Sequence, residues 1–282
     1  MVENRPIARL MAHLFLIIGV IVVAFPVYYT FVASTQATPD IANGHISLLP
    51  GHELAANYAQ ALGSGVANLN TSPVTRLLLN SLIVALTIAV GKIAISLLSA
   101  YAVVFFRFPL RMVFFWMIFV TLMLPVEVRI LPTYKVVADL GMLNSYGGLT
   151  IPLIASATAT LLFRQFFLTL PDELVEAAKI DGAGPLRFLR DMVLPLSRTN
   201  IAALFVILFI YGWNQYLWPL LITNSSDMET IIIGLKRSMG TSDALTDWGA
   251  VMATTMLAML PPVAVVVFMQ RWFVKGLVDT EK

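Results

Sequence analysis

Residues 173–195 read ELVEAAKIDGAGPLRFLRDMVLP and form the longest polar stretch of an otherwise apolar chain. Charged side chains recur at helical spacing in its first half, at Glu173, Glu176 and Lys179. Residues 181–185, DGAGP, then place two glycines beside a proline, which ends a helix. A basic amphipathic segment runs on to Leu194-Pro195. The stretch predicts a helix, a turn and a second helix that lie outside a bilayer.

The composition around this stretch is that of a membrane protein. Hydrophobic residues make up 59% of the chain and charged residues 12%, with a mean hydropathy of +0.84. Soluble domains average about 45–50% apolar and about 25% charged residues. A net charge of +2 gives no reason to expect nucleic acid as a partner. The chain has no Cys, and its three His residues have no ligand spacing, so we expect neither a metal site nor a cofactor held by this chain.

Six stretches are long and apolar enough, or nearly so, to cross a bilayer, which takes about 20 residues. They are roughly 10–33, 77–106, 112–131, 147–168, 201–222 and 248–274. The first is longer than the apolar core of a signal peptide, about 7–15 residues, and is therefore expected to remain as a span. No internal repeat or linker divides the chain. We predict an all-α membrane protein with six transmembrane helices in one domain, 1–282.

The distribution of Lys and Arg predicts the orientation, because positively charged loops stay in the cytoplasm. An inside N-terminus places most of these residues on the cytoplasmic side. Both termini and the polar loop 169–200 are then cytoplasmic. Two segments face outward, 34–76 and 223–247, and are long enough to touch a soluble protein. We read 34–76 as an ordered loop with short helical pieces, since it has no apolar core of its own.

The third span ends in a proline-rich segment that predicts a broken helix near the outer face. Pro125 and Pro132 lie seven residues apart, with Glu127 and Arg129 between them. These two charges are either solvated at the membrane interface or line a transport path. The sequence alone leaves both interpretations open.

Residues 213–219, WNQYLWP, carry polar groups into the fifth span. Asn214 and Gln215 are costly in hydrocarbon unless they face protein or water. The aromatic side chains favour an interfacial belt combined with hydrogen bonds between helices. The alternative is a polar lining of the path by Asn214, Gln215 and Tyr216.

Lys92 is the sharpest single residue, because it lies near the middle of the second span, 16 residues after Arg76 and 15 before Arg107. An ammonium at that depth costs on the order of 2.5–3.5 kcal/mol and has to face a cavity or a partner. Lys92 either helps attract an anionic substrate or pairs with a neighbouring helix.

The sequence lacks the residue patterns that catalysis would need. Gly91-Lys92 resembles the end of a phosphate-binding loop, but Leu86 and Ile93 stand where that motif needs Gly and Ser or Thr. The chain also lacks a zincin His-Glu arrangement, a Gly-x-Ser-x-Gly elbow and paired carboxylates inside a span. We therefore expect a transport component and not an enzyme.

The polar stretch also carries a recognisable pattern. Residues 176–178, Glu-Ala-Ala, are followed by Gly182 and by Leu194-Pro195 at the spacing EAA-x3-G-x9-I-x-LP, with Met192 where Ile is usual. This resembles the EAA loop of permeases in binding-protein-dependent ABC importers. Six spans, this late loop and the run WNQYLWPLL are similar to the carbohydrate-type permeases of the second maltose permease family. Further segments resemble the permeases of glycerol-3-phosphate importers: MVENRP, FRFPLRMVFFWMIFVTLMLPVEVRILPT, ASATATLLFRQFFLTLPDELVEAAKIDGA, YGWNQYLWPLLI and LVDTEK.

The resemblance implies a machine of several chains in the inner membrane. It contains a second homologous permease subunit, a dimer of ATP-binding-cassette ATPases that binds ATP and Mg²⁺ on the cytoplasmic face, and an outer solute-binding protein. Closure of the ATPases would drive alternating access through the EAA loop. The implied coupling positions are Glu176, Ala177, Ala178, Asp181, Gly182, Leu194 and Pro195.

Three substrates or mechanisms remain open at this point. The expected one is import of sn-glycerol-3-phosphate or a glycerophosphodiester, which the positive charge of Lys92 favours. The same machine could import a neutral di- or oligosaccharide. A secondary transporter that works alone would predict an inverted repeat or more buried acidic groups, and neither is present in the sequence.

Overall fold

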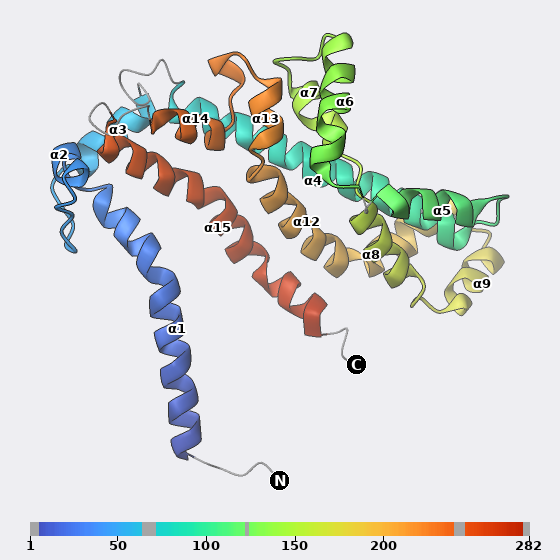
Figure 1. Ribbon diagram of the computed structural model, residues 1–282. Coiled ribbons are helices and arrows are strands. Elements are labelled where there is room, and N and C mark those ends of the chain that lie inside the picture. The colour runs from blue at the N-terminus through green and yellow to red at the C-terminus, as the bar shows by residue number, and fades with distance from the viewer. Residues whose placement is uncertain (1–5, 64–71, 122–123, 240–245, 279–282) are drawn as a thin grey trace. The chain divides into compact units, whose positions relative to one another are not determined.

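The computed structural model describes residues 6–63, 72–121, 124–239 and 246–278, and regular structure in these ranges is helical throughout (Figure 1). The predicted all-α class is confirmed. Contacts between residues group the chain into two compact units. Unit 1 comprises Met1–Arg76 and Gly234–Met259, and unit 2 comprises Leu77–Ile233 and Leu260–Lys282. The single domain expected over 1–282 remains a prediction.

Unit 1 contains α1 (Pro6–Ala33), α2 (Thr38–Ala42), α3 (Leu54–Gly63) and the first part of α15 (Trp248–Val278). One carboxylate joins these pieces. Asp247 accepts hydrogen bonds from Thr38 Oγ1 and from Gln60 Nε2, both at 2.6 Å. Asn57 Nδ2 donates to the carbonyl oxygens of Ser34 and Gln36. The described part of segment 34–76 is thus an ordered loop with two short helices, as predicted.

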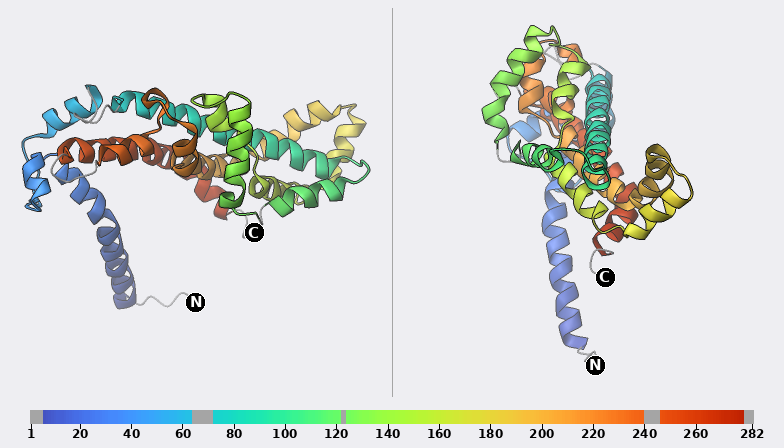
Figure 2. Two further views of the ribbon diagram at one scale, coloured as in Figure 1. Left: turned by 45° about the horizontal axis from the view of Figure 1, so that its top comes forward. Right: turned by 90° about the vertical axis from the view of Figure 1, so that its right-hand side faces the viewer.

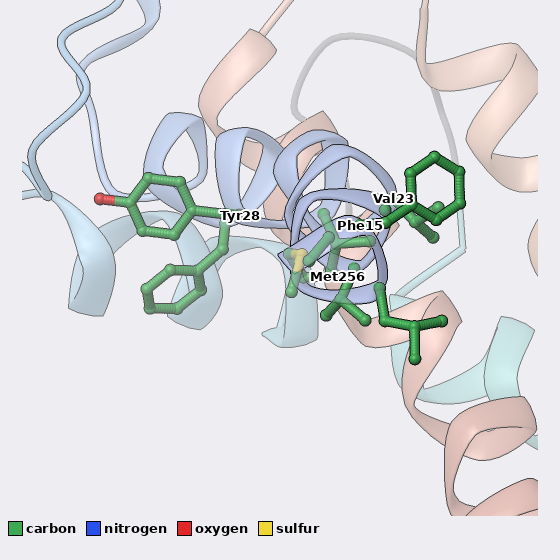
Figure 3. A pocket seen from close by; sticks show the side chains of 10 residues that line it. Phe15, Val23, Tyr28 and Met256 are labelled. Atoms are coloured by element: carbon green, nitrogen blue, oxygen red, sulfur yellow. The ribbon is translucent and has the colours of Figure 1, made fainter. Parts of the chain in front are cut away.

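The apolar surface of α1 is almost bare. Within Leu10–Ala33 none of the most apolar 18-residue window is buried. One side of α1, with Met256 of α15, lines a groove of about 930 Å³ in which only Tyr28 carries a polar side-chain atom (Figure 3). The Tyr28 hydroxyl itself donates to the Leu48 carbonyl oxygen, 2.7 Å away. This groove suits lipid or another apolar helix, and offers nothing to a charged solute.

Unit 2 holds most of the remaining helices. In chain order they are α4 (Val74–Phe105), α5 (Arg111–Val120), α6 (Val126–Asp139), α7 (Tyr146–Thr150), α8 (Ala157–Phe167), α9 (Asp172–Ile180), α10 (Pro185–Phe188), α11 (Leu194–Leu196), α12 (Arg198–Trp213), α13 (Leu217–Ile222) and the start of α14 (Ile231–Ser238). Its core joins α4, α6, α7 and α13 through Val84, Ile88, Ile130, Val137, Leu149, Trp218 and Ile222.

Three helices among the described residues are individually long and apolar enough to span a membrane: Leu10–Ala33, Val74–Phe105 and Trp248–Gln270. Two bent pairs pass the same test together. Tyr146–Leu153 meets Ala157–Phe167 at 47°, and Pro185–Leu196 meets Arg198–Trp213 at 73°. These are three to five spans, so the count of six stays a prediction. The first, second and last predicted stretches coincide with the three long helices.

The other predicted stretches are interrupted helices, and local chemistry explains the interruptions. The third stretch is divided between α5 and α6, and α6 begins directly after Pro125, which confirms the predicted break. The fourth is broken at 154–156, where the Ser156 hydroxyl caps α8 by accepting from Ala159 N–H. The fifth is interrupted between Trp213 and Leu217. Hydropathy averaged over a sequence window detects the apolar run but not the caps and breaks inside it.

Candidate coupling surface and substrate path

The polar stretch folds as predicted into a helix, a turn and a second helical segment. Helix α9 ends at Ile180, and Gly182 follows at φ +67°, a left-handed conformation that only glycine adopts without strain. Gly182 N–H donates to the Lys179 carbonyl and Ala183 N–H to the Ala178 carbonyl, 2.8 Å away. This pair of bonds is a Schellman motif, and it turns the chain toward Pro185 at the start of α10.

Most predicted coupling residues lie on the surface of this loop. Glu176, Ala177, Asp181, Gly182 and Pro195 are exposed, Leu194 is half-buried, and Ala178 is turned inward. Two large apolar side chains stand out beside them. Ile180 is 86% exposed and Leu186 is 80% exposed. These two side chains give the loop apolar area beside its charges.

The second half of the loop is anchored to α4. The Tyr101 hydroxyl donates to the Pro185 carbonyl oxygen at 2.8 Å. The ring of Phe188 packs edge-on against Phe105 with centroids 5.4 Å apart. Figure 2 (left) shows the loop beside the end of α4. The loop is therefore attached to α4, a connection that sequence reasoning missed because it joins residues 84 positions apart.

Lys92 lies on the same helix, nine residues before Tyr101. Its side chain is 7% exposed, and its ammonium lies 3.7 Å from the centroid of the Tyr211 ring on α12. Among the residues that the structure describes, no carboxylate lies within 4.0 Å of this ammonium. An ion pair or hydrogen bonds with a neighbouring helix were expected from the sequence, and the structure instead shows a cation–π contact with α12.

A small cavity of about 100 Å³ brings two further candidates together. Arg129 from α6 and Gln215 from the link between α12 and α13 line it, along with Ile130, Thr133, Pro152, Leu153, Leu217 and Trp218. Gln215 Nε2 also donates to the Tyr211 carbonyl oxygen, 3.1 Å away. Asn214 and Tyr216 are exposed and do not line the cavity. The side chain of Glu127 lies outside the described part of the structure.

The aromatic side chains of 213–219 differ from the expected interfacial belt. Trp213 and Trp218 are buried within the protein. Trp218 Nε1 donates to the Gly148 carbonyl oxygen at 3.1 Å, which fixes α13 against α7. The belt interpretation is wrong for these two residues. The hydrogen bond between helices comes from Trp218, whereas Gln215 bonds to Tyr211 of its own segment.

One polar residue in the second span escaped the sequence analysis. Asn80 is fully buried, and its Nδ2 donates to the carbonyl oxygens of Asp227 and Glu229. Its Oδ1 accepts from the Tyr146 hydroxyl at 2.7 Å. The sequence signal that could have identified this residue is an Asn near one end of an apolar run. Its role is to hold segment 226–230 onto α4.

The comparison with protein families decides the identity. Residues 92–279 match the model of the family described as binding-protein-dependent transport system inner membrane component. The chain belongs to this family. As a member it is a multi-pass inner-membrane permease component and not an enzyme, and it works in a system that includes a binding protein.

Curated relatives match over the full length of both chains. The chain is 68% identical to the sn-glycerol-3-phosphate transport system permease protein UgpE of Agrobacterium fabrum, 67% identical to that of Rhizobium meliloti and 58% identical to that of Pectobacterium atrosepticum, each over 282 residues and 100% of both chains. Its fold is similar to a chain of a bacterial ABC transporter involved in the import of alginate, with a TM-score of 0.81, 20% sequence identity and coverage of 97% of this chain and 99% of the other.

Proposed function

We propose that this permease component carries sn-glycerol-3-phosphate, or glycerophosphodiesters, into the cell as one transmembrane subunit of an ATP-driven importer. The observation that carries the proposal is identity of up to 68%, without gaps in coverage, to permeases named for sn-glycerol-3-phosphate transport. The resemblance to the alginate importer supports the fold alone, since the two chains share 20% of their residues.

The ATPase subunits, which supply the energy, dock on the loop between α8 and α12. Glu176 supplies a charge, and the bare side chains of Ile180 and Leu186 supply apolar area, for a groove on an ATPase subunit. The Schellman turn at Gly182 presents these groups on a fixed surface. ATP and Mg²⁺ are bound by the ATPase dimer, and this chain contributes the docking surface.

The signal then reaches the membrane interior through α4. A shift of the loop pulls on Pro185 and Phe188, and these contact Tyr101 and Phe105 on α4. Lys92 lies nine residues further along the same rigid helix, about 13 Å away at the rise of an α-helix. Alternating access follows when α4 moves relative to α12.

Two more partners complete the assembly. The apolar face of α1 packs on a second permease subunit, giving a heterodimer that buries the groove of Figure 3. Segments 34–76 and 223–247 face outward and receive the solute-binding protein. Both termini and loop 169–200 lie in the cytoplasm, in accord with the distribution of Lys and Arg.

The coupling role is tested by the double variant Glu176→Lys with Gly182→Asp. A reversed charge and a Cβ at a left-handed position should abolish uptake and ATPase co-purification while the chain still enters the membrane. Lys135→Glu, an exposed charge reversal on α6, is the matched control and should leave both intact. Uptake at the unaltered rate in the double variant would remove the coupling assignment.

The substrate is tested through the binding protein of the same system, because that protein makes the first selection. Calorimetry with sn-glycerol-3-phosphate, a glycerophosphodiester and a disaccharide should show binding of the phosphorylated polyols. Binding of the disaccharide alone would replace the proposed substrate with a neutral sugar and leave the importer assignment intact.

A further inference from the structure

Two cations of unit 2, Lys92 and Arg129, each lie beside the end of α12. Lys92 is buried, and its contact is with the Tyr211 ring. Arg129 is exposed and lines the cavity. Neither forms an ion pair within 4.0 Å among the described residues. A buried cation such as Lys92 is costly in an apolar membrane domain, and such residues mark pathways for charged solutes.

The last turn of α12 connects these two cations. Tyr211 supports Lys92 with its ring, and its carbonyl oxygen accepts a hydrogen bond from Gln215 Nε2. Gln215 in turn lines the cavity with Arg129. A ligand in the cavity can therefore contact Gln215. Gln215 lies one helical turn after Tyr211, whose ring contacts Lys92.

The size of the cavity limits what it holds. At about 100 Å³ it is well below the roughly 300–1,000 Å³ of pockets that enclose drug-sized ligands. A disaccharide does not fit, whereas a single tetrahedral anionic group does. The guanidinium of Arg129 offers paired N–H donors, the geometry that suits phosphate oxygens.

The contact of Lys92 with Tyr211 is weak enough to be exchanged. A cation–π contact is a modest interaction, and a charge-assisted hydrogen bond to phosphate is stronger than a neutral one. An anion bound by Arg129 offers Lys92 such a bond in place of the ring. Lys92 is then free to leave the ring and bind the anion.

We propose, on the basis of the proposed function, that Lys92 and Arg129 together bind the phosphate group of the substrate during its passage and favour a doubly charged phosphate monoester over a singly charged diester. Tyr211 holds Lys92 while the site is empty. Gln215 positions the phosphate at the entrance. The two cations thus add a second selection step inside the membrane, after the binding protein.

The test uses the complete transporter in proteoliposomes, with uptake of sn-glycerol-3-phosphate and of glycerophosphoglycerol measured side by side. Lys92→Gln and Arg129→Gln should each lower uptake of the monoester by about tenfold or more and uptake of the diester by less, so the ratio of the two falls. Lys92→Arg and Arg129→Lys keep the charges and should retain most of the ratio. Lys135→Gln removes a cation from the same helix as Arg129 but not from the cavity, and should change nothing.

Stimulation of ATP hydrolysis by the binding protein shows that each variant is assembled. An unchanged ratio of monoester to diester uptake in both Gln variants would overturn the two-cation site while leaving the proposed function in place. Failure of the unaltered transporter to import either compound would overturn the proposed function itself. A fall in the ratio for the Gln variants that the Arg and Lys variants prevent supports the proposal.

Discussion

The Lys92 ammonium lies 3.7 Å from the centroid of the Tyr211 ring, so a charge of α4 is held by an aromatic face of α12. Replacing the ring tests how much this contact stabilises unit 2. Tyr211→Phe keeps the aromatic face and should leave thermal stability nearly unchanged. Tyr211→Leu removes it and should lower stability by about 0.5–2 kcal/mol. Melting of the purified complex measures the difference, and equal melting of the two variants would show that the ring contact does not stabilise the protein.

The turn of the coupling loop offers a comparison between two neighbouring glycines. Gly182 has φ +67° and Gly184 has φ −69°, and a Cβ added at either position meets no atom within 4 Å. Gly182→Ala should therefore strain the turn by about 1 kcal/mol, while Gly184→Ala should be neutral. Hydrogen exchange across 172–196 and the affinity for the ATPase partner report the effect. Equal effects of the two substitutions would show that the left-handed turn is unimportant.

Much of the coupling surface was predictable because its determinants are local. Helical spacing, the glycines and the prolines of 173–195 are read within one stretch, and the structure confirms the helix, the turn and the second helical segment. The all-α class followed from composition for the same reason. The break before Val126 likewise follows from Pro125 alone.

What could not be predicted depends on contacts between distant residues. The bond from Tyr101 to Pro185, the ring under Lys92 and the burial of Trp218 each join segments that hydropathy treats separately. The count of six spans stays a prediction for a related reason. Capping at Ser156 and the interruption after Trp213 divide runs that look continuous in composition.

Close packing at the broken fourth span makes a third prediction. A Cβ at Gly91 would lie 2.7 Å from Ile154 Cγ2, so Gly91→Ala forces α4 away from the break. We expect a loss of about 1–3 kcal/mol of stability from overpacking. Ile154→Ala removes the clashing methyl group, and the double variant should recover part of the loss. Gly63→Ala on α3, where no atom of a neighbouring residue lies within 4 Å of the added Cβ, is the control. If the changes in melting temperature of the two single variants simply add in the double variant, the two residues do not interact and this contact is contradicted.

Asn80 makes the last prediction, because it is the buried residue that holds segment 226–230 to α4. Asn80→Ala leaves the carbonyl oxygens of Asp227 and Glu229 without this donor, at a cost of about 1–3 kcal/mol. Tyr146→Phe removes only the hydroxyl that donates to Asn80 Oδ1 and should cost about 1 kcal/mol. Hydrogen exchange of residues 224–231 should therefore accelerate more in Asn80→Ala than in Tyr146→Phe. Because this segment is proposed to face the binding protein, stimulation of ATP hydrolysis by that protein should weaken in the same order. Unaltered exchange in Asn80→Ala would mean that other contacts hold the segment.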